Sequence, residues 1–257
     1  MQKSCFLLNS LFVFSFASLI SFQPENASAA TINLQNGTAT FSQQLFGGPF
    51  TPAQAVDGNF GDPNGWAIAR SPDVQNSFSE TAVWETETDV AAGNLAISMH
   101  FLHSNPGHLL GRFRLSVTTD DRSTFADGLG TNGDVTANWS VLDNAIVTGP
   151  SGMTFTTLGD DSILAGGTVA ATGTYTLNYS TTIDNITGLR LEALEHPTLA
   201  NNGPGFPGNG NFLLTEITLD ATPVQETVPE PAGILSLLVA AGFGVALKNK
   251  KRNEVCD

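Results

Sequence analysis

Strict alternation of apolar and polar side chains recurs along the middle of this sequence and constrains the fold more than any other feature. In the clearest case, Leu95, Ile97, Met99 and Phe101 alternate with small or polar residues. Successive side chains of a β-strand point to opposite faces of a sheet, so this pattern predicts a strand with one buried face. Because no window there sustains an apolar stripe at the helical period of about 3.6 residues, the predicted fold class is all-β.

The number and spacing of these segments indicate how the strands are organised. Alternation recurs at 113–117, 175–179, 189–194 and 213–219, and shorter strand candidates lie at 38–46, 81–88, 137–142 and 153–158. Clusters of Gly, Asn, Asp and Pro separate them, as expected of turns. Many short strands with turns between them are typical of a β-sandwich or jelly roll. We see no internal repeat or linker in this stretch, so we predict one domain over residues 30–221.

The charge and cysteine content of the middle segment exclude several classes of function. Residues 30–227 contain no lysine and five arginines against 20 acidic residues. Binding to nucleic acid and docking on anionic lipid both need clustered cations, so neither is predicted. The two cysteines, Cys5 and Cys256, lie near the ends. The middle therefore has no disulfide scaffold, no cysteine nucleophile and no cysteine-based metal centre.

The N-terminus has the composition of a secretory signal peptide. Lys3 gives a basic start, residues 6–22 are apolar, and Ala27-Ser28-Ala29 forms an A-x-A pattern. These three regions in this order are what signal peptidase recognises. We therefore expect residues 1–29 to be a signal helix that is cleaved after Ala29. An uncleaved membrane anchor is the alternative.

A second apolar segment lies near the C-terminus. Residues 222–231 are proline-rich and predict an extended linker. Residues 232–247 are uncharged and mostly apolar, and as a helix they would be about 24 Å long, slightly short of a hydrocarbon core of about 30 Å. The basic cluster at 248–252 follows at once, and such clusters stay cytoplasmic. We expect a single transmembrane helix over 232–247 and a basic cytoplasmic tail over 248–257.

The three-part order of this tail resembles the PEP-CTERM sorting signal. The motif is Pro229, Glu230 and Pro231, followed by the apolar helix and the basic cluster. Residues 253–257 after the cluster depart from the pattern. The resemblance implies recognition by exosortase-type sorting machinery, anchoring in the inner membrane through the C-terminal helix, and delivery to the cell surface or extracellular matrix of a bacterium. An ordinary single-span anchor is the plainer interpretation.

A second resemblance covers residues 38–219. The segments 55–59, 65–66, 108–116, 186–192 and 213–217, in this order, resemble galactose-binding-like (discoidin-type) β-sandwiches. The resemblance implies an eight-stranded jelly-roll sandwich. Many relatives bind glycans, and many hold one structural calcium where an early Asp-Gly loop meets a late strand.

The loop 57–65 is the candidate calcium site. It carries Asp57, Asn59 and Asp62, and the resemblance brings Glu216 to it from the late strand. Calcium takes about six to eight oxygen ligands, which carboxylates, amides and backbone carbonyls supply. The spacing differs from an EF-hand, because the twelfth position is Ile68. We predict one structural calcium on these four residues; a plain turn is the alternative.

Four residues are candidates for contacting a ligand. His103 and His108 flank a Pro-Gly loop, where an imidazole can hydrogen-bond a sugar hydroxyl. Arg112, with Arg114, is the densest positive spot, and a tryptophan such as Trp66 can stack on a sugar ring. The alternatives are loop histidines without a ligand, a strand-surface salt bridge, and a core tryptophan. We favour the core for Trp66 while keeping it among the candidates.

Motifs for catalysis are absent from the sequence. It contains no G-x-S-x-G, no H-E-x-x-H and no phosphate-binding loop. We predict an exported, surface-sorted, non-enzymatic protein that is a glycan-contacting or structural component of the bacterial envelope or extracellular matrix, with extracellular polysaccharide as a partner. The alternative is a secreted glycan-active hydrolase, which needs two carboxylates about 5–10 Å apart across a cleft. A purely architectural matrix protein is the third interpretation.

Overall fold

The computed structural model describes residues 28–70 and 78–224. The sorting motif at 229–231, the transmembrane helix at 232–247, the basic tail and nearly all of the signal peptide lie outside these residues. Among the described residues, no helix has the length and apolar character needed to span a membrane.

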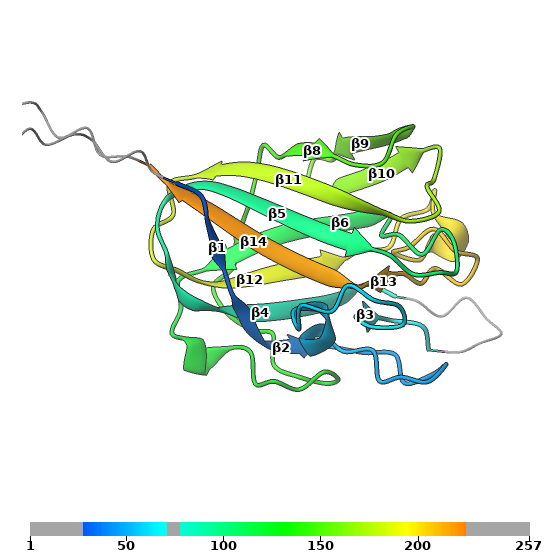
Figure 1. Ribbon diagram of the computed structural model, residues 1–257, viewed down its shortest axis with the longest axis horizontal. Coiled ribbons are helices and arrows are strands. Elements are labelled where there is room, and N and C mark those ends of the chain that lie inside the picture. Colours follow the sequence, from blue (N-terminus) through cyan, green and yellow to red (C-terminus); the bar gives the residue numbers. More distant parts are fainter. Residues whose placement is uncertain (1–27, 71–77, 225–257) are drawn as a thin grey trace, which may run out of the picture.

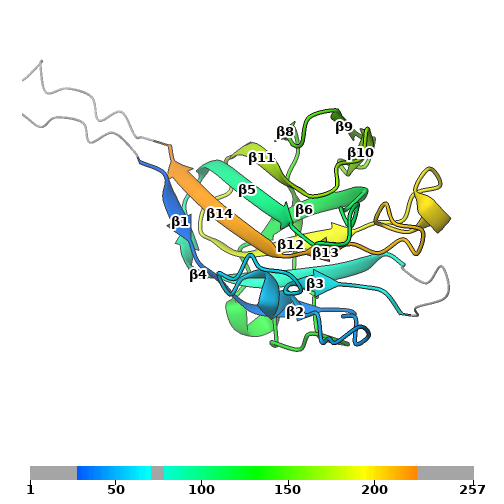
Figure 2. The same ribbon diagram turned by 45° about the vertical axis from the view of Figure 1, so that its right-hand side comes forward.

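Two antiparallel sheets, packed face to face, form the body of the molecule (Figures 1 and 2). The first sheet has the order β1-β14-β5-β11-β8. Its strands are β1 (Ala30–Ile32), β14 (Glu216–Pro223), β5 (Gly93–Phe101), β11 (Gly173–Thr181) and β8 (Ile146–Thr148). The described residues therefore form an all-β sandwich, which confirms the predicted fold class.

The second sheet is the larger and has the order β2-β4-β12-β6-β10-β9, with β7 paired to β6. Its strands are β2 (Leu34–Ala39), β4 (Glu80–Val90), β12 (Ile186–Ala193), β6 (Arg112–Thr118), β10 (Ile163–Gly167), β9 (Met153–Thr157) and β7 (Ser140–Val141). A separate pair joins β3 (Trp66–Ala67) to β13 (Leu213–Leu214). Three short 3-10 helices complete the described structure: η1 (Pro52–Ala55), η2 (Arg122–Thr124) and η3 (Ala200–Asn202).

The alternation seen in the sequence places the core between the two sheets. In β5, Leu95, Ile97, Met99 and Phe101 are each at most 1% exposed, while the residues between them are half-buried. Ile97 lies opposite Leu177 of β11 and Leu219 of β14, so apolar side chains meet across three strands. Burying each such side chain stabilises the fold by about 1.5–3 kcal/mol.

The strand predicted at 38–46 differs from the structure. β2 ends at Ala39, and the chain then leaves the sheet. Gln43 accepts a hydrogen bond from the Phe50 backbone at 3.0 Å and donates its own N–H to the Ala67 carbonyl at 2.8 Å. The residues after Ala39 are thus held by a neighbouring loop and by β3, which places Gln43 and Phe50 at one end of the sandwich.

Both ends of the described chain leave the sandwich together, and the loops after β5 and before β13 lie at the opposite end (Figure 1). Ala30 of β1 pairs with Ala221 of β14, and Pro223 of β14 pairs with Gly93, the first residue of β5. His100, near the last residue of β5, pairs instead with Glu216, where β14 begins. The loop that follows β5 therefore lies far from both ends of the described chain.

Candidate functional site

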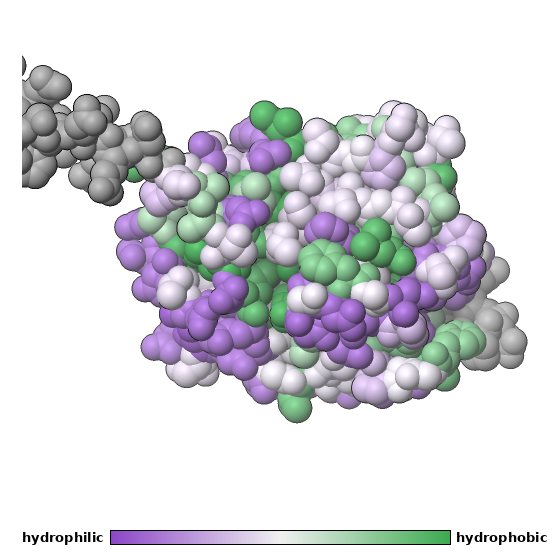
Figure 3. Space-filling view, viewed as in Figure 1, coloured by the Kyte–Doolittle hydropathy of each residue, from purple (hydrophilic) through white to green (hydrophobic). Residues whose placement is uncertain are grey.

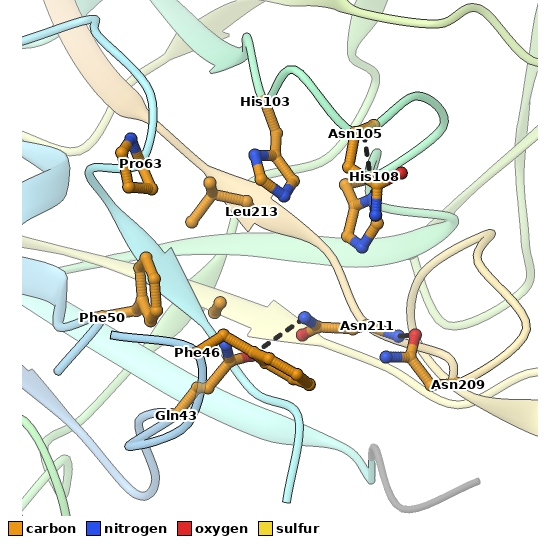
Figure 4. Close-up of a pocket in the computed structure, with 11 residues that line it drawn as sticks. Gln43, Phe46, Phe50, Pro63, His103, Asn105, His108, Asn209, Asn211 and Leu213 are labelled. Atoms are coloured by element: carbon orange, nitrogen blue, oxygen red, sulfur yellow. Dashed lines mark hydrogen bonds between the residues drawn. The ribbon is translucent and has the colours of Figure 1, made fainter. Parts of the chain in front are cut away.

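A hollow of about 330 Å³ lies among the loops that follow β5 and precede β13 (Figure 4). We call it the histidine pocket. It is lined by Gln43, Phe46, Phe50, Pro63, Ala67, His103, Asn105, His108, Asn209, Asn211 and Leu213. Its volume lies at the lower end of the range of about 300–1,000 Å³ found for small-molecule sites.

The floor of the histidine pocket is a buried pair of amides. The Asn211 Nδ2 donates to Gln43 Oε1 at 3.0 Å, and the same oxygen accepts the Ala69 backbone N–H at 3.2 Å. The Asn211 Oδ1 accepts the Ile68 backbone N–H at 2.9 Å. These bonds join the loop after β2 to the residues that follow β3 and to the loop before β13. Because the polar groups satisfy one another, the floor is formed before any ligand arrives.

The hydrogen bonds of His103 and His108 fix which nitrogen of each ring carries the proton. The His103 Nδ1 bonds a carboxylate oxygen of Asp62, and the His108 Nδ1 lies 3.0 Å from the Asn105 carbonyl oxygen. Both partners are acceptors, so each Nδ1 donates and each Nε2 is an acceptor in the neutral ring. The rings meet edge to face with centroids 4.8 Å apart, and both extend into the pocket (Figure 4).

The charge states follow from the surroundings of these groups. Burial is the largest cause that lowers the pKa of His108, and the neighbouring His103 lowers that pKa further when it is charged. Burial alone would raise the pKa of Asp62, but hydrogen bonds from Ser104 and His103 outweigh it and leave the pKa of Asp62 lowered. His108 is therefore neutral at neutral pH, and Asp62 is a carboxylate.

Phe46 stands exposed at the rim of the histidine pocket. Its side chain is 64% exposed, and its backbone has a φ of +57°, which is uncommon for a bulky residue. Phe46 lines the pocket together with the polar side chains of Asn105 and Asn209 (Figure 4). None of these three residues is among the ligand-binding residues that the sequence predicts. The only signal was the Gly47-Gly48 turn after Phe46, and a turn does not say which neighbour is exposed.

Two of the predicted ligand-binding residues do not belong to the pocket. Trp66 is fully buried, and its Nε1 donates to the Phe41 carbonyl at 3.0 Å, so it offers no ring face and its predicted ligand contact is wrong. The Arg112 guanidinium bonds Ser162, Asp160 and the Glu195 carbonyl at 2.7–2.9 Å. That is the salt-bridge alternative, and the structure does not bring Arg112 to the pocket.

A second hollow, of about 470 Å³, lies between β1, β14 and the loop after η1. Its lining combines apolar side chains such as Ile32 with polar ones such as Asn33, and Figure 3 shows hydrophobic and hydrophilic residues side by side on this face. Asp57 and Glu216 both line this hollow. Glu216 is 4% exposed; its Oε1 accepts the Gly58 backbone N–H at 3.2 Å, and its Oε2 is buried without a partner among the described residues. Burial raises the pKa of Glu216 to about 7, and the nearby Asp57 adds to that rise.

The residues predicted to hold calcium are only partly brought together. Asp57 and Glu216 share the second hollow, and the unpartnered Glu216 Oε2 beside a second carboxylate is an arrangement that a cation would balance. The Asn59 Oδ1 instead accepts the Gly61 backbone N–H at 3.0 Å. Asp62 does not line this hollow, and its oxygens accept hydrogen bonds from His103 and Ser104. No cluster of three or more His, Cys, Asp or Glu that suits a metal occurs in the part of the chain that the structure describes.

Comparison with solved structures gives distant matches. No family model matches the sequence, and no curated protein matches it. Among solved structures, the chain is similar to the module CpGH89CBM32-5 from Clostridium perfringens, in complex with GalNAc-β-1,3-galactose, with a TM-score of 0.42 and 14% identity over 73% of this chain and 94% of that one. The family 32 carbohydrate-binding module of C. perfringens NanJ, in complex with galactose, gives 0.35 and 7% over 75% and 99%.

Proposed function

We propose that this protein is exported, sorted to the bacterial surface or matrix, and there contacts a glycan without catalysing a reaction. The observation that carries the proposal is the histidine pocket, where imidazole acceptors and amide groups converge beside the exposed ring of Phe46. A sugar offers hydroxyls to such polar groups and an apolar C–H face to an aromatic ring. The histidine pocket offers both the polar groups and the exposed aromatic ring.

The composition of the pocket favours an uncharged sugar. Apart from the two histidines, none of the described residues that line it is ionisable. His108 is neutral at neutral pH, because burial lowers its pKa. An anionic sugar would therefore find no guanidinium or ammonium partner among these residues, and leaving its charge unpaired on binding would be costly. We propose a neutral glycan as the ligand class.

Glycan binding is tested with a glycan array and isothermal titration calorimetry on the purified protein, in EDTA and in calcium. D-galactose and GalNAc-β-1,3-galactose, the ligands of the two solved structures, are the first probes. We expect Phe46→Ala and His108→Ala each to weaken binding at least tenfold, or about 1.4 kcal/mol. The matched control is Ile146→Ala, which removes a 70% exposed side chain from β8. Binding that survives both pocket variants, or no binding to any neutral glycan, refutes the proposal.

Export and sorting are proposed from the sequence of the two ends. The signal peptide at 1–29 supports export, and Pro229, Glu230 and Pro231 before the apolar and basic segments support handling by exosortase-type machinery at the inner membrane. The test is a pulse-chase in a bacterium with and without its exosortase. A tail that is processed equally in both strains, or unaffected by replacing all three motif residues with alanine, contradicts this part of the proposal.

We further propose that the sandwich is a galactose-binding-like jelly roll with one structural calcium beside Glu216. The unpartnered Glu216 Oε2 and the neighbouring Asp57 support the cation, with backbone carbonyls of the loop as further ligands. Calcium should raise the melting temperature of the wild type, and Glu216→Gln should abolish that rise. An identical melting temperature in calcium and in EDTA excludes the site.

A secreted hydrolase is the second candidate, and one observation favours it. Asp57 and Glu216 line the same hollow, and the pKa of Glu216 is raised to about 7, as expected of a general acid. Glu216 is 4% exposed, however, and the Asp57 Oδ1 already accepts hydrogen bonds from Asn59 and Asn64. A hydrolase would release reducing sugar from a bound glycan, and Glu216→Gln would stop that release. Binding without release supports the non-enzymatic proposal.

A further inference from the structure

The pairing of His103 and His108 gives the histidine pocket a property beyond sugar contact. Their ring centroids lie 4.8 Å apart, and each ring directs its Nδ1 to a protein oxygen. Both rings line the same pocket (Figure 4), and an imidazole whose Nδ1 donates a hydrogen bond keeps a lone pair on Nε2. The pocket therefore contains two potential nitrogen ligands.

The oxygens that accept the Nδ1–H groups of the two rings are of the kinds that hold metal-bound histidines in place. A histidine that binds a metal through one nitrogen usually donates its other N–H to a carboxylate or a backbone carbonyl, which fixes the ring orientation. His103 has the carboxylate of Asp62, which Ser104 holds in turn through a 2.5 Å hydrogen bond. His108 has the carbonyl of Asn105 at 3.0 Å. Both rings are therefore oriented before any ion binds.

We propose that His103 and His108 bind one divalent ion of the zinc or copper type through their Nε2 atoms. Imidazole nitrogen suits Zn²⁺ and Cu²⁺ at about 2.0–2.1 Å, whereas Ca²⁺ and Mg²⁺ prefer oxygen. The negative charge of Asp62 lies directly behind His103 and partly balances the ion.

The site is open and its ion exchangeable. The described residues provide no third His, Cys, Asp or Glu to complete a cluster, so water fills the remaining positions. The bound ion would occupy the same lone pairs that accept hydroxyls in the proposed glycan complex. The metal site itself does not depend on glycan binding, because it rests on the two rings and the groups behind them.

The experiment is a titration of the metal-free purified protein with ZnCl₂ and CuCl₂, followed by calorimetry and, for copper, by electron paramagnetic resonance. We expect nitrogen hyperfine structure from the bound copper in the wild type. His103→Ala and His108→Ala should each weaken this binding at least tenfold. The control is His196→Ala, a loop imidazole outside the pocket that bonds Thr198. Because cysteine thiolates are also ligands for soft metals and Cys256 lies outside the pocket, the conclusion is drawn from the difference between variants.

Two further measurements make the result decisive. Circular dichroism verifies that each variant is folded, and Asp62→Asn, which keeps the ring geometry but removes the charge behind His103, should weaken binding by less than His103→Ala. Nitrogen ligation that persists in both pocket variants overturns the proposal, as does equal weakening by His196→Ala. The metal titration contains no glycan, and the glycan array in EDTA contains no free metal ion. The metal proposal and the glycan proposal are therefore tested independently.

Discussion

Glu216 holds its proton more tightly in the folded protein than in an unfolded chain, and this links stability to pH. Burial raises its pKa from the ordinary value of 4.5 to about 7. Between these two values the folded state binds more protons than the unfolded state, so the free energy of unfolding falls as pH rises. This contribution is fully present below about pH 4.5 and is lost as pH passes through 7.

The structure sets the size of the effect. One pKa unit corresponds to about 1.4 kcal/mol, so the rise from 4.5 to about 7 amounts to about 3 kcal/mol. This is an upper bound, because Glu216 lines a hollow that admits water. Glu216→Gln keeps the acceptor for the Gly58 N–H and removes the buried charge. We therefore expect the variant to be more stable than the wild type by up to about 3 kcal/mol at pH 8, and within about 1 kcal/mol of it at pH 5.

The assay is urea unfolding at pH 5 and pH 8 in EDTA, which keeps cations from the carboxylates. The matched control is Glu87→Gln, an exposed residue on β4 that bonds Asn33. If Glu216→Gln loses as much stability between pH 5 and pH 8 as the wild type does, the buried carboxyl group of Glu216 is not what links stability to pH. Repeating the pH 8 measurement with calcium shows whether a cation replaces the proton, since it should stabilise the wild type and leave Glu216→Gln unchanged.

Three further outcomes follow from packing and charge. Met99→Ala removes a fully buried side chain of β5 and should lower the free energy of unfolding by about 2–5 kcal/mol in urea titration. Arg112→Ala breaks a partly exposed ion pair with Asp160, so the loss should stay near 1 kcal/mol, and glycan binding by calorimetry should not change. Gly65→Ala should unfold the protein or lower its melting temperature sharply, because the new Cβ would lie 2.0 Å from the Leu214 carbonyl oxygen. The matched variant Gly107→Ala meets nothing within 4 Å and should lower the free energy of unfolding by only about 1 kcal/mol. Equal melting temperatures for these two glycine variants would contradict the steric argument.

The architecture was largely predictable because it depends on a local signal. The alternation at 95–101 corresponds to β5, and the alternation at 113–117 lies within β6. Such patterns indicate which face of a strand is buried, and the burial of that face determines the register in which the strands pair. The segment 213–219 was less well predicted: the structure divides it into β13 and β14, because Leu213 and Leu214 pair with β3 instead.

The candidate site was predicted only in part, because it is made by contacts between loops. His103 and His108 were selected from the sequence, but their edge-to-face contact depends on how the loop after β5 folds. Asp62 bonds His103, which lies 41 positions further along the chain. The composition of the loop 57–65 instead predicts Asp62 as a calcium ligand. Likewise, the exposure of Phe46 is set by a turn with positive φ that no periodic pattern records.

The shared exit of the two chain ends has a practical consequence. A tag, dye or biosensor surface coupled near Ala30 or Pro223 would hold the protein by the end remote from His103 and His108. Immobilised in this orientation, every molecule would present the same face to a soluble analyte. A tether at either end would likewise direct the loop of His103 and His108 away from the surface to which the tether is attached.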